Sequence, residues 1–241
     1  MPVTAVSAAP AENPASPAIS ISTSRDQCAW NAGLKVDGEF YEADEVRAIL
    51  ATCSRAPTGL RDRAYLLTLW QAGLRCFEAI DLLPSDIDFQ RETVRVRDGK
   101  GGKSRRSGIG PEALAAISDW LSVRGGKLVM NARVSRRKAD LGRLVYPDPL
   151  PFVFCTLSTG RTVSPRDMRE MLARRAAKSG LGRRAHLHGM RHSHAVALDR
   201  SGTPVSVTSQ QLGHGSLAIT TTYLAHINSD QKVAAVRGAF G

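Results

Sequence analysis

Apolar residues recur at helical spacing in the part of the chain that follows residue 41. An acidic first turn, which suits a helix N-terminus, precedes the first such run, made up of Val46, Ile49, Leu50 and Cys53. A second helix is expected from about Leu60 to Gly73. A third is expected from Cys76 to Leu83, because Pro84 disfavours helical geometry in the residue before it.

Residues 93–109 show a different pattern, that of a β-hairpin. Val94 and Val96 alternate with polar neighbours, as they do in a half-buried strand. A Gly-rich turn at residues 98–103 comes next, and a weaker returning strand is expected from Ser104 to Ile109.

The rest of the chain returns to helical spacing. Helices are expected from Pro111, over residues 165–179, 190–199 and 204–212, and a further segment at residues 217–226. Residues 124–149 show no clear period and are predicted to form a basic loop, whereas residues 152–154 are typical of a short strand. The predicted fold class is mainly α with a small antiparallel β-hairpin or sheet (α+β).

Residues 1–41 differ in composition from the remainder of the chain. The first 25 residues are rich in Ala, Pro and Ser and nearly uncharged, so we expect a mostly disordered tail before one domain at residues 42–241. The chain has no secretory signal pattern and no apolar run near the ~20 residues of a membrane-spanning helix. Four scattered cysteines without a CxxC pair suit a reducing compartment. A cytoplasmic, nucleoid-associated protein with no membrane partner is expected.

The positive charge of the chain is concentrated in one segment. Lys and Arg outnumber Asp and Glu by 33 to 22, which gives a net charge of +11. Residues 121–186 contain fifteen Lys and Arg residues against four acidic residues, so this segment alone accounts for the excess. Because a solvated surface normally mixes both signs, the segment favours a phosphate-bearing partner, nucleic acid.

Several polar residues recur at short spacings, and each such group alone is a weak signal of function. Arg75 comes after the end of an apolar helix, with Glu78 three residues further on, and His188 and Arg191 share one face of a helix start. Together with polar residues elsewhere in the chain they form the ordered set Arg75, Lys100, His188, Arg191, His214 and Tyr223.

This set resembles the catalytic signature of the tyrosine recombinases, the phage-integrase family. The segment 73–78 is similar to the family's Gly-Leu-Arg-x-x-Glu box, 98–103 to its Gly-Lys-Gly-x-Lys hairpin, and 188–192 to its His-x-x-Arg-His box. Leu212-Gly213-His214 resembles its Leu-Gly-His box, and Tyr223 its nucleophile. The resemblance extends from about Glu42 to the C-terminus and implies the fold of the family's catalytic domain.

The sequence departs from the family at two places. Ser107 and Gly108 stand where the family usually has apolar strand residues, which weakens the expected returning strand. Only 41 residues precede Glu42, so the chain resembles either the short recombinases that consist of the catalytic domain alone, such as the fimbrial switch invertases, or a truncated integrase.

The resemblance implies a role for each residue, without a metal or other cofactor. Tyr223 attacks the scissile phosphorus to form a 3′-phosphotyrosine and release a 5′-hydroxyl. Arg75 and Arg191 hold the non-bridging oxygens, and Lys100 protonates the leaving 5′-oxygen. The remaining assignments are His188 as proton acceptor or phosphate ligand, His214 as a phosphate donor, Glu78 as a supporting residue, and Lys103, Arg105 and Arg106 as DNA contacts.

Three of these assignments have alternatives. Lys103 competes with Lys100 as the general acid. His188 and His192 have the spacing of a zinc pair, but Gly189 stands where the HExxH motif needs Glu, so no metal site is expected. His192 is expected to be structural, and His194 and His226 to be surface or packing residues.

The implied function is a bacterial or mobile-element site-specific recombinase that integrates, excises or inverts DNA. It would act on double-stranded DNA as a homotetramer on paired sites, and accessory DNA-bending proteins are further candidate partners. Two other functions stay open: a DNA-binding remnant or regulator without recombination activity, and type IB topoisomerase-like strand relaxation. Residues 224–241 are expected to form a tail, which the resemblance places on a neighbouring protomer and which could equally pack on its own domain through Val233, Val236 and Phe240.

Overall fold

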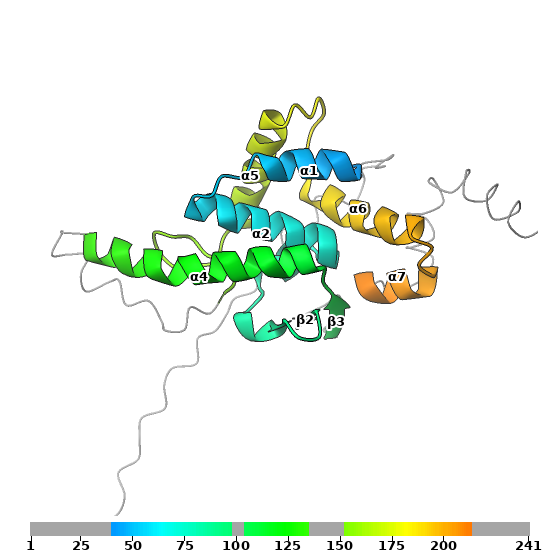
Figure 1. Ribbon diagram of the computed structural model, residues 1–241, viewed down its shortest axis with the longest axis horizontal. Coiled ribbons are helices and arrows are strands. Elements are labelled where there is room, and N and C mark those ends of the chain that lie inside the picture. The colour runs from blue at the N-terminus through cyan, green and yellow to red at the C-terminus, as the bar shows by residue number, and fades with distance from the viewer. Residues whose placement is uncertain (1–39, 98–103, 135–151, 214–241) are drawn as a thin grey trace, which may run out of the picture. The chain divides into compact units, whose positions relative to one another are not determined.

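The structure is a computed structural model in which residues 40–97, 104–134 and 152–213 are described, the side chains of residues 125–134 excepted. Seven helices lie in this part of the chain (Figure 1): α1 Ala43–Ala51, α2 Pro57–Ala72, α3 Cys76–Ile80, α4 Pro111–Val134, α5 Pro165–Lys178, α6 Leu187–Arg200 and α7 Val205–Leu212. A 3-10 turn, η2 Pro84–Asp86, precedes the strands β1 Ile87–Asp88, β2 Thr93–Val96 and β3 Arg105–Gly108. The predicted class, mainly α with a small antiparallel sheet, is confirmed.

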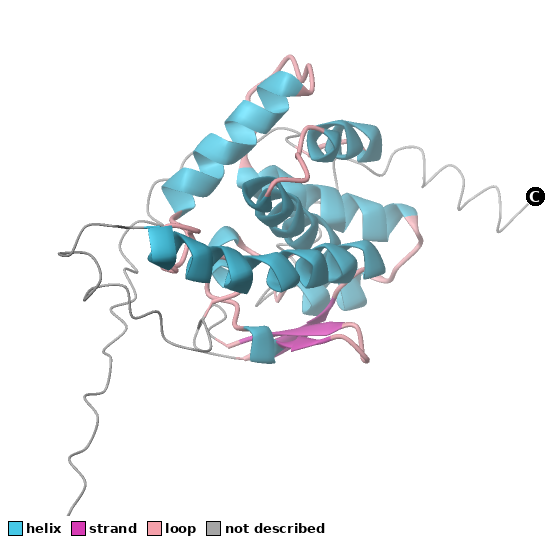
Figure 2. Cartoon of the chain, turned by 60° about the vertical axis from the view of Figure 1, so that its left-hand side comes forward, coloured by secondary structure: helices cyan, strands magenta, loops and turns pink. Residues whose placement is uncertain are grey.

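Helix α2 is the centre of the core. Its apolar residues are buried on nearly all sides, and it packs against α4 on one side and α6 on another (Figures 1 and 2). Trp120 of α4 is fully buried and donates a hydrogen bond from its indole nitrogen to the carbonyl oxygen of Val153, at 2.7 Å. The segment around residue 153 is thereby joined to the central helices.

Two predictions about the middle of the chain are wrong. The expected basic loop begins inside a helix, because α4 continues from Pro111 to Val134. Once a helix is nucleated, each added residue gains a hydrogen bond, so the segment stays helical without an apolar period. Residues 152–154 form no strand. The side chains of Val153 and Phe154 are buried in the core, and the backbone N–H of Val153 donates to the carbonyl of Leu82. The strand-like pairing next to this segment is the isolated Cys155–Thr162 bridge.

The three strands form an antiparallel sheet in the order β1-β2-β3. Val94 pairs with Ser107 and Val96 with Arg105, so the expected returning strand forms as β3 despite its polar residues. Helix α7 packs on β3, and polar groups of α7 provide partners for Ser107 and Gly108.

Two helices end at left-handed glycines that belong to the sequence motifs. Gly73 terminates α2 and Gly213 terminates α7, each with φ 63°. Glycine adopts this conformation without the strain that a Cβ atom causes. The left-handed residue at the end of α2 turns the chain sharply, so that Arg75 leaves the axis of this helix. Among the described residues no helix is long and apolar enough to cross a membrane.

Candidate active site

The first arginine motif is the start of helix α3. Arg75 is its N-cap residue, and Glu78, at the third helical position, accepts a hydrogen bond from the backbone N–H of Arg75 at 2.8 Å. A Glu at this position satisfies an N–H that the helix itself leaves without a partner. The spacing Arg-x-x-Glu therefore has a structural cause in the capping of a very short helix.

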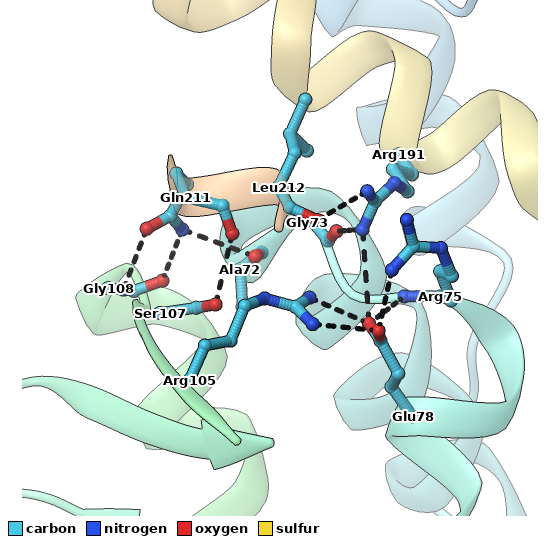
Figure 3. Close-up of polar contacts among 10 residues, drawn as sticks. All are labelled: Ala72, Gly73, Arg75, Glu78, Arg105, Ser107, Gly108, Arg191, Gln211 and Leu212. Carbon is cyan, nitrogen blue, oxygen red and sulfur yellow. Dashed lines mark hydrogen bonds and ion pairs between the residues drawn. The ribbon is translucent and has the colours of Figure 1, made fainter. Parts of the chain in front are cut away.

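Three guanidinium groups surround the carboxylate of Glu78 (Figure 3). Arg75 contacts Oε1 at 2.8 Å, and Arg105 binds both oxygens at 2.8 Å each. The Nη1 atom of Arg191 lies 3.9 Å from Oε2. The side chain of Glu78 is only 6% exposed, whereas that of Arg75 is 30% exposed. Three positive charges around one negative charge leave a local excess that suits an anionic ligand.

The ionic cluster keeps Glu78 charged. Burial alone raises the pKa of this carboxyl group, but the hydrogen bonds and charge of Arg105, together with those of Arg75, lower the pKa to about 2. Glu78 is thus a fixed negative charge at neutral pH and holds the guanidinium groups in place.

Arg191 joins the ends of two helices. It is 2% exposed on α6 and donates to the carbonyl oxygen of Gly73 at 2.5 Å and to that of Leu212 at 2.6 Å (Figure 3). Both carbonyls lie at helix C-termini, where the helix supplies no partner of its own. The second arginine of the motif set is therefore anchored between α2, α6 and α7.

His188 lies one helical turn before Arg191. Desolvation by the surrounding protein, followed by the positive charges of Arg191 and Arg75, lowers the pKa of His188 to about 4. Part of the surface of His188 is exposed, which limits the effect of desolvation on its pKa. The two neighbouring positive charges also lower the pKa, so the two effects add. The ring is therefore neutral at pH 7, as a proton acceptor requires.

The two neighbouring histidines, His192 and His194, have different surroundings, and His194 is a packing residue. The rings of His188 and His192 meet edge to face, with centroids 4.5 Å apart. His194 is 7% exposed, its Nδ1 donates to the carbonyl of Trp70 at 2.8 Å, and its ring lies against Gly73. In residues 40–97, 104–134 and 152–213 no three His, Cys, Asp or Glu side chains form a group that suits a metal ion.

The two arginines of β3, Arg105 and Arg106, differ in exposure and in their contacts. Arg106 is exposed, as a DNA contact would be. Arg105 is directed to Glu78, and its side chain is 13% exposed, so the sequence prediction missed its place in the ionic cluster. Strand alternation carries the signal, because residue 105 shares a face with the buried Ser107.

The remaining predicted residues lie outside the described part of the chain. These are Lys100, Lys103, His214, Tyr223 and His226, together with the expected segment at residues 217–226 and the tail residues Val233, Val236 and Phe240. The described half of the site brings together Arg75, Glu78, His188 and Arg191, with Arg105 as an added member.

Comparison with known proteins gives a consistent result. The model of the family described as "Phage integrase family" matches residues 39–230. The chain is 31% identical over 184 residues to tyrosine recombinase XerC of Alcanivorax borkumensis, covering 76% of this chain and 54% of that protein. It is 34% identical over 185 residues to tyrosine recombinase XerC 2 of Ralstonia nicotianae, with 76% and 48% covered. The chain thus spans about half the length of the curated relatives it matches.

Solved structures share the fold. The crystal structure of XerA recombinase superposes with a TM-score of 0.61 at 22% identity, covering 84% of this chain and 65% of that one. A post-cleavage complex of XerH site-specific recombinase on a palindromic difH substrate gives 0.62 at 21%, covering 82% and 52%. At this identity the likeness establishes the fold class, that of the tyrosine recombinases.

Proposed function

Because the chain belongs to the phage integrase family, we propose that it is a site-specific recombinase that cleaves and rejoins double-stranded DNA through Tyr223. The observation that carries the proposal is the ionic cluster, in which Arg75, Arg105 and Arg191 surround Glu78. The cluster has three guanidinium groups for one carboxylate, so it retains the excess positive charge that a phosphodiester needs.

In the proposed reaction, the Tyr223 hydroxyl oxygen attacks the phosphorus and the bond to the 5′-oxygen breaks. His188, neutral before the reaction, takes the tyrosine proton, and Lys100 gives a proton to the leaving 5′-oxygen. Arg75 and Arg191 offset the negative charge of the phosphorane, with His214 as a further donor. The 5′-hydroxyl of a second strand then attacks the phosphotyrosine, which restores the diester and Tyr223.

The wider organisation belongs to the same proposal. Residues 42–241 form the catalytic domain after a tail at residues 1–41, and residues 224–241 dock on a neighbouring protomer in a tetramer on paired sites. The family membership and the DNA-bound state of a structural relative support a DNA partner. Exposed Arg169, Arg174 and Lys178 on α5 lie in the basic segment and offer phosphate contacts.

The experiment that tests the proposal is strand exchange on a selected site. The full chain is incubated with duplexes of random sequence that carry a nick near the centre, and covalently trapped duplexes are sequenced to define a cleavage site. Plasmids with two copies of this site are expected to give inverted or deleted products. Relaxation of a plasmid that lacks the site would indicate a topoisomerase instead, and DNA binding without covalent products would indicate a DNA-binding regulator.

A further inference from the structure

Three elements that adjoin candidate catalytic residues in the sequence lie next to one another. Helix α2 ends just before Arg75, β3 comes after the connection that contains Lys100, and α7 ends just before His214. Arg191 joins α2 to α7 through the carbonyls of Gly73 and Leu212. The side chain that joins β3 to both helices is Gln211, which neither the motifs nor the family resemblance assigns.

The amide of Gln211 pairs with β3 as a strand backbone would (Figure 3). Its Oε1 accepts from the N–H of Gly108 at 2.9 Å, and its Nε2 donates to the carbonyl of the same residue at 2.8 Å. Exchange of both hydrogen bonds with one residue is the arrangement of a hydrogen-bonded pair in an antiparallel ladder. The Nε2 also donates to the carbonyl of Ala72, at the end of α2, at 3.2 Å.

The backbone around Gln211 is held at the same place. The hydroxyl of Ser107, a residue only 1% exposed, donates to the carbonyl of Gln211 at 3.0 Å. The last four carbonyls of α7 are thus all satisfied: those of residues 209 and 210 by the N–H of Gly213, that of 211 by Ser107 and that of 212 by Arg191. The polar residues of β3 that depart from the family pattern are partners of this helix end.

We infer that Gln211 is a positioning residue. Its amide fixes strand β3 to the ends of α2 and α7, and thereby positions the chain that leads from Lys100 into β3. The inference rests on the proposed function, in which Lys100 protonates the leaving 5′-oxygen. Release of β3 therefore slows leaving-group departure, while the arginines that hold the phosphate keep their own contacts with Glu78 and with the helix ends.

The test replaces Gln211 by Leu and measures cleavage of two substrates at saturating DNA. One is the nicked duplex that carries the selected site. The other carries sulfur in place of the bridging 5′-oxygen at the cleaved bond, and its thiolate leaves without a general acid because its pKa is low. On ordinary DNA, Gln211→Leu is expected to slow covalent trapping roughly 10-fold to 100-fold. On the sulfur substrate its rate is expected to lie within about threefold of the wild-type rate.

Gln210 provides the matched control, because it is the same residue type one position earlier and its side chain is exposed. Gln210→Leu is expected to cleave both substrates like the wild type. Gln211→Glu keeps an acceptor for the N–H of Gly108 but loses the hydrogen bonds donated to the carbonyls of Gly108 and Ala72. It is therefore expected to show the same slow cleavage of ordinary DNA. This variant replaces Gln211→Leu if Gln211→Leu does not fold. Amide exchange at Gly108, followed by NMR, should accelerate in Gln211→Leu, which removes the acceptor of this N–H, and stay unchanged in Gln210→Leu.

The outcomes separate the inference from the proposed function. If the wild type forms no covalent product with either substrate, the proposed function fails. If the wild type cleaves both and Gln211→Leu cleaves ordinary DNA at the same rate, or is slowed equally on both substrates, the positioning role is wrong. Accelerated exchange at Gly108 with normal cleavage also contradicts it.

Discussion

Glu78 is the residue on which the electrostatic balance of the site depends. Glu78→Gln leaves the guanidinium groups of Arg75, Arg105 and Arg191 close together without their common counter-charge. Removal of one partner from a buried ionic cluster typically costs about 3–5 kcal/mol of stability. We expect a loss of unfolding free energy of this size in denaturant titrations at pH 7, and a loss of covalent trapping. A variant as stable as the wild type would contradict the assigned role.

The same carboxylate predicts a pH dependence. The pKa of Glu78 is lowered to about 2 in the folded protein, so its contribution to stability is complete above the unfolded value of 4.5. The contribution is lost as the pH falls from about 4.5 towards 2, because the unfolded chain then takes up the proton first. The difference in unfolding free energy between wild type and Glu78→Gln should therefore shrink across this range. A constant difference would contradict the pKa.

His188 should change its pKa when DNA binds. The desolvated ring beside Arg191 and Arg75 has a pKa of about 4 in the DNA-free protein, and a bound phosphate between these groups adds negative charge that raises it. The Hε1 resonance, assigned with His188→Asn, is expected to titrate near pH 4 without DNA. It should titrate at higher pH in the complex of Tyr223→Phe with the nicked duplex. A pKa near 6.5 without DNA would show that the ring is solvated and remote from the arginines.

Arg105 and Arg106 are adjacent in β3 but should respond differently to the same substitution. Arg106 is exposed and lies opposite Arg95 across the hairpin, a pairing of like charges that a phosphate would relieve. Arg106→Gln should weaken DNA binding and reduce the slope of affinity against salt by about 1. Arg105→Gln should leave the slope unchanged and lower stability instead, since Arg105 is bound to Glu78. Equal slopes for the two variants would refute this division.

At the scale of elements, the glycine caps of α2 and α7 determine where the helices end. A Cβ atom at Gly73 would lie 2.5 Å from Cδ2 of the buried His194, in addition to the strain of φ 63°. Gly202 has a similar φ of 77°, and a Cβ atom there would meet no other atom within 4 Å. Substitution at Gly202 therefore measures the cost of backbone strain without a steric clash. Gly202→Ala should cost about 1–2 kcal/mol. Gly73→Ala should cost at least about 1 kcal/mol more in the same thermal or denaturant unfolding measurement. Equal losses of stability in the two variants would mean that the side chain of His194 moves away from the added Cβ atom at no cost in free energy.

The elements also differ in how much the sequence reveals about them. Helix α5 was predictable because its period is clean and its start carries Ser164, Pro165 and Asp167 in capping positions. The extension of α4 beyond Arg124 was not predictable, because the sequence of this segment shows no clear helical period. The segment at residues 152–154, of which Val153 and Phe154 are buried, was mistaken for a strand because a short apolar run indicates burial and does not specify the backbone geometry.

At the scale of the whole molecule, charge composition indicates a partner but not its contact surface. Arg175 and Arg124 belong to the basic segment, yet Arg175 pairs with the buried Asp62 and Arg124 binds the main chain of Phe152. Individual motif residues were recognisable because their chemistry is specific. Arg105 and Gln211 were not, because their roles arise only when β3, α2 and α7 meet in three dimensions.

The central claim is that the chain cleaves DNA through Tyr223, and covalent trapping tests it most directly. Wild type and Tyr223→Phe are incubated with the nicked random duplexes, separated under denaturing conditions, and the adduct is digested and mapped by mass spectrometry. We predict a wild-type adduct on the peptide that contains Tyr223, and DNA binding without an adduct for Tyr223→Phe. An adduct that persists in Tyr223→Phe, or a wild type that binds these duplexes and never forms one, would contradict the claim.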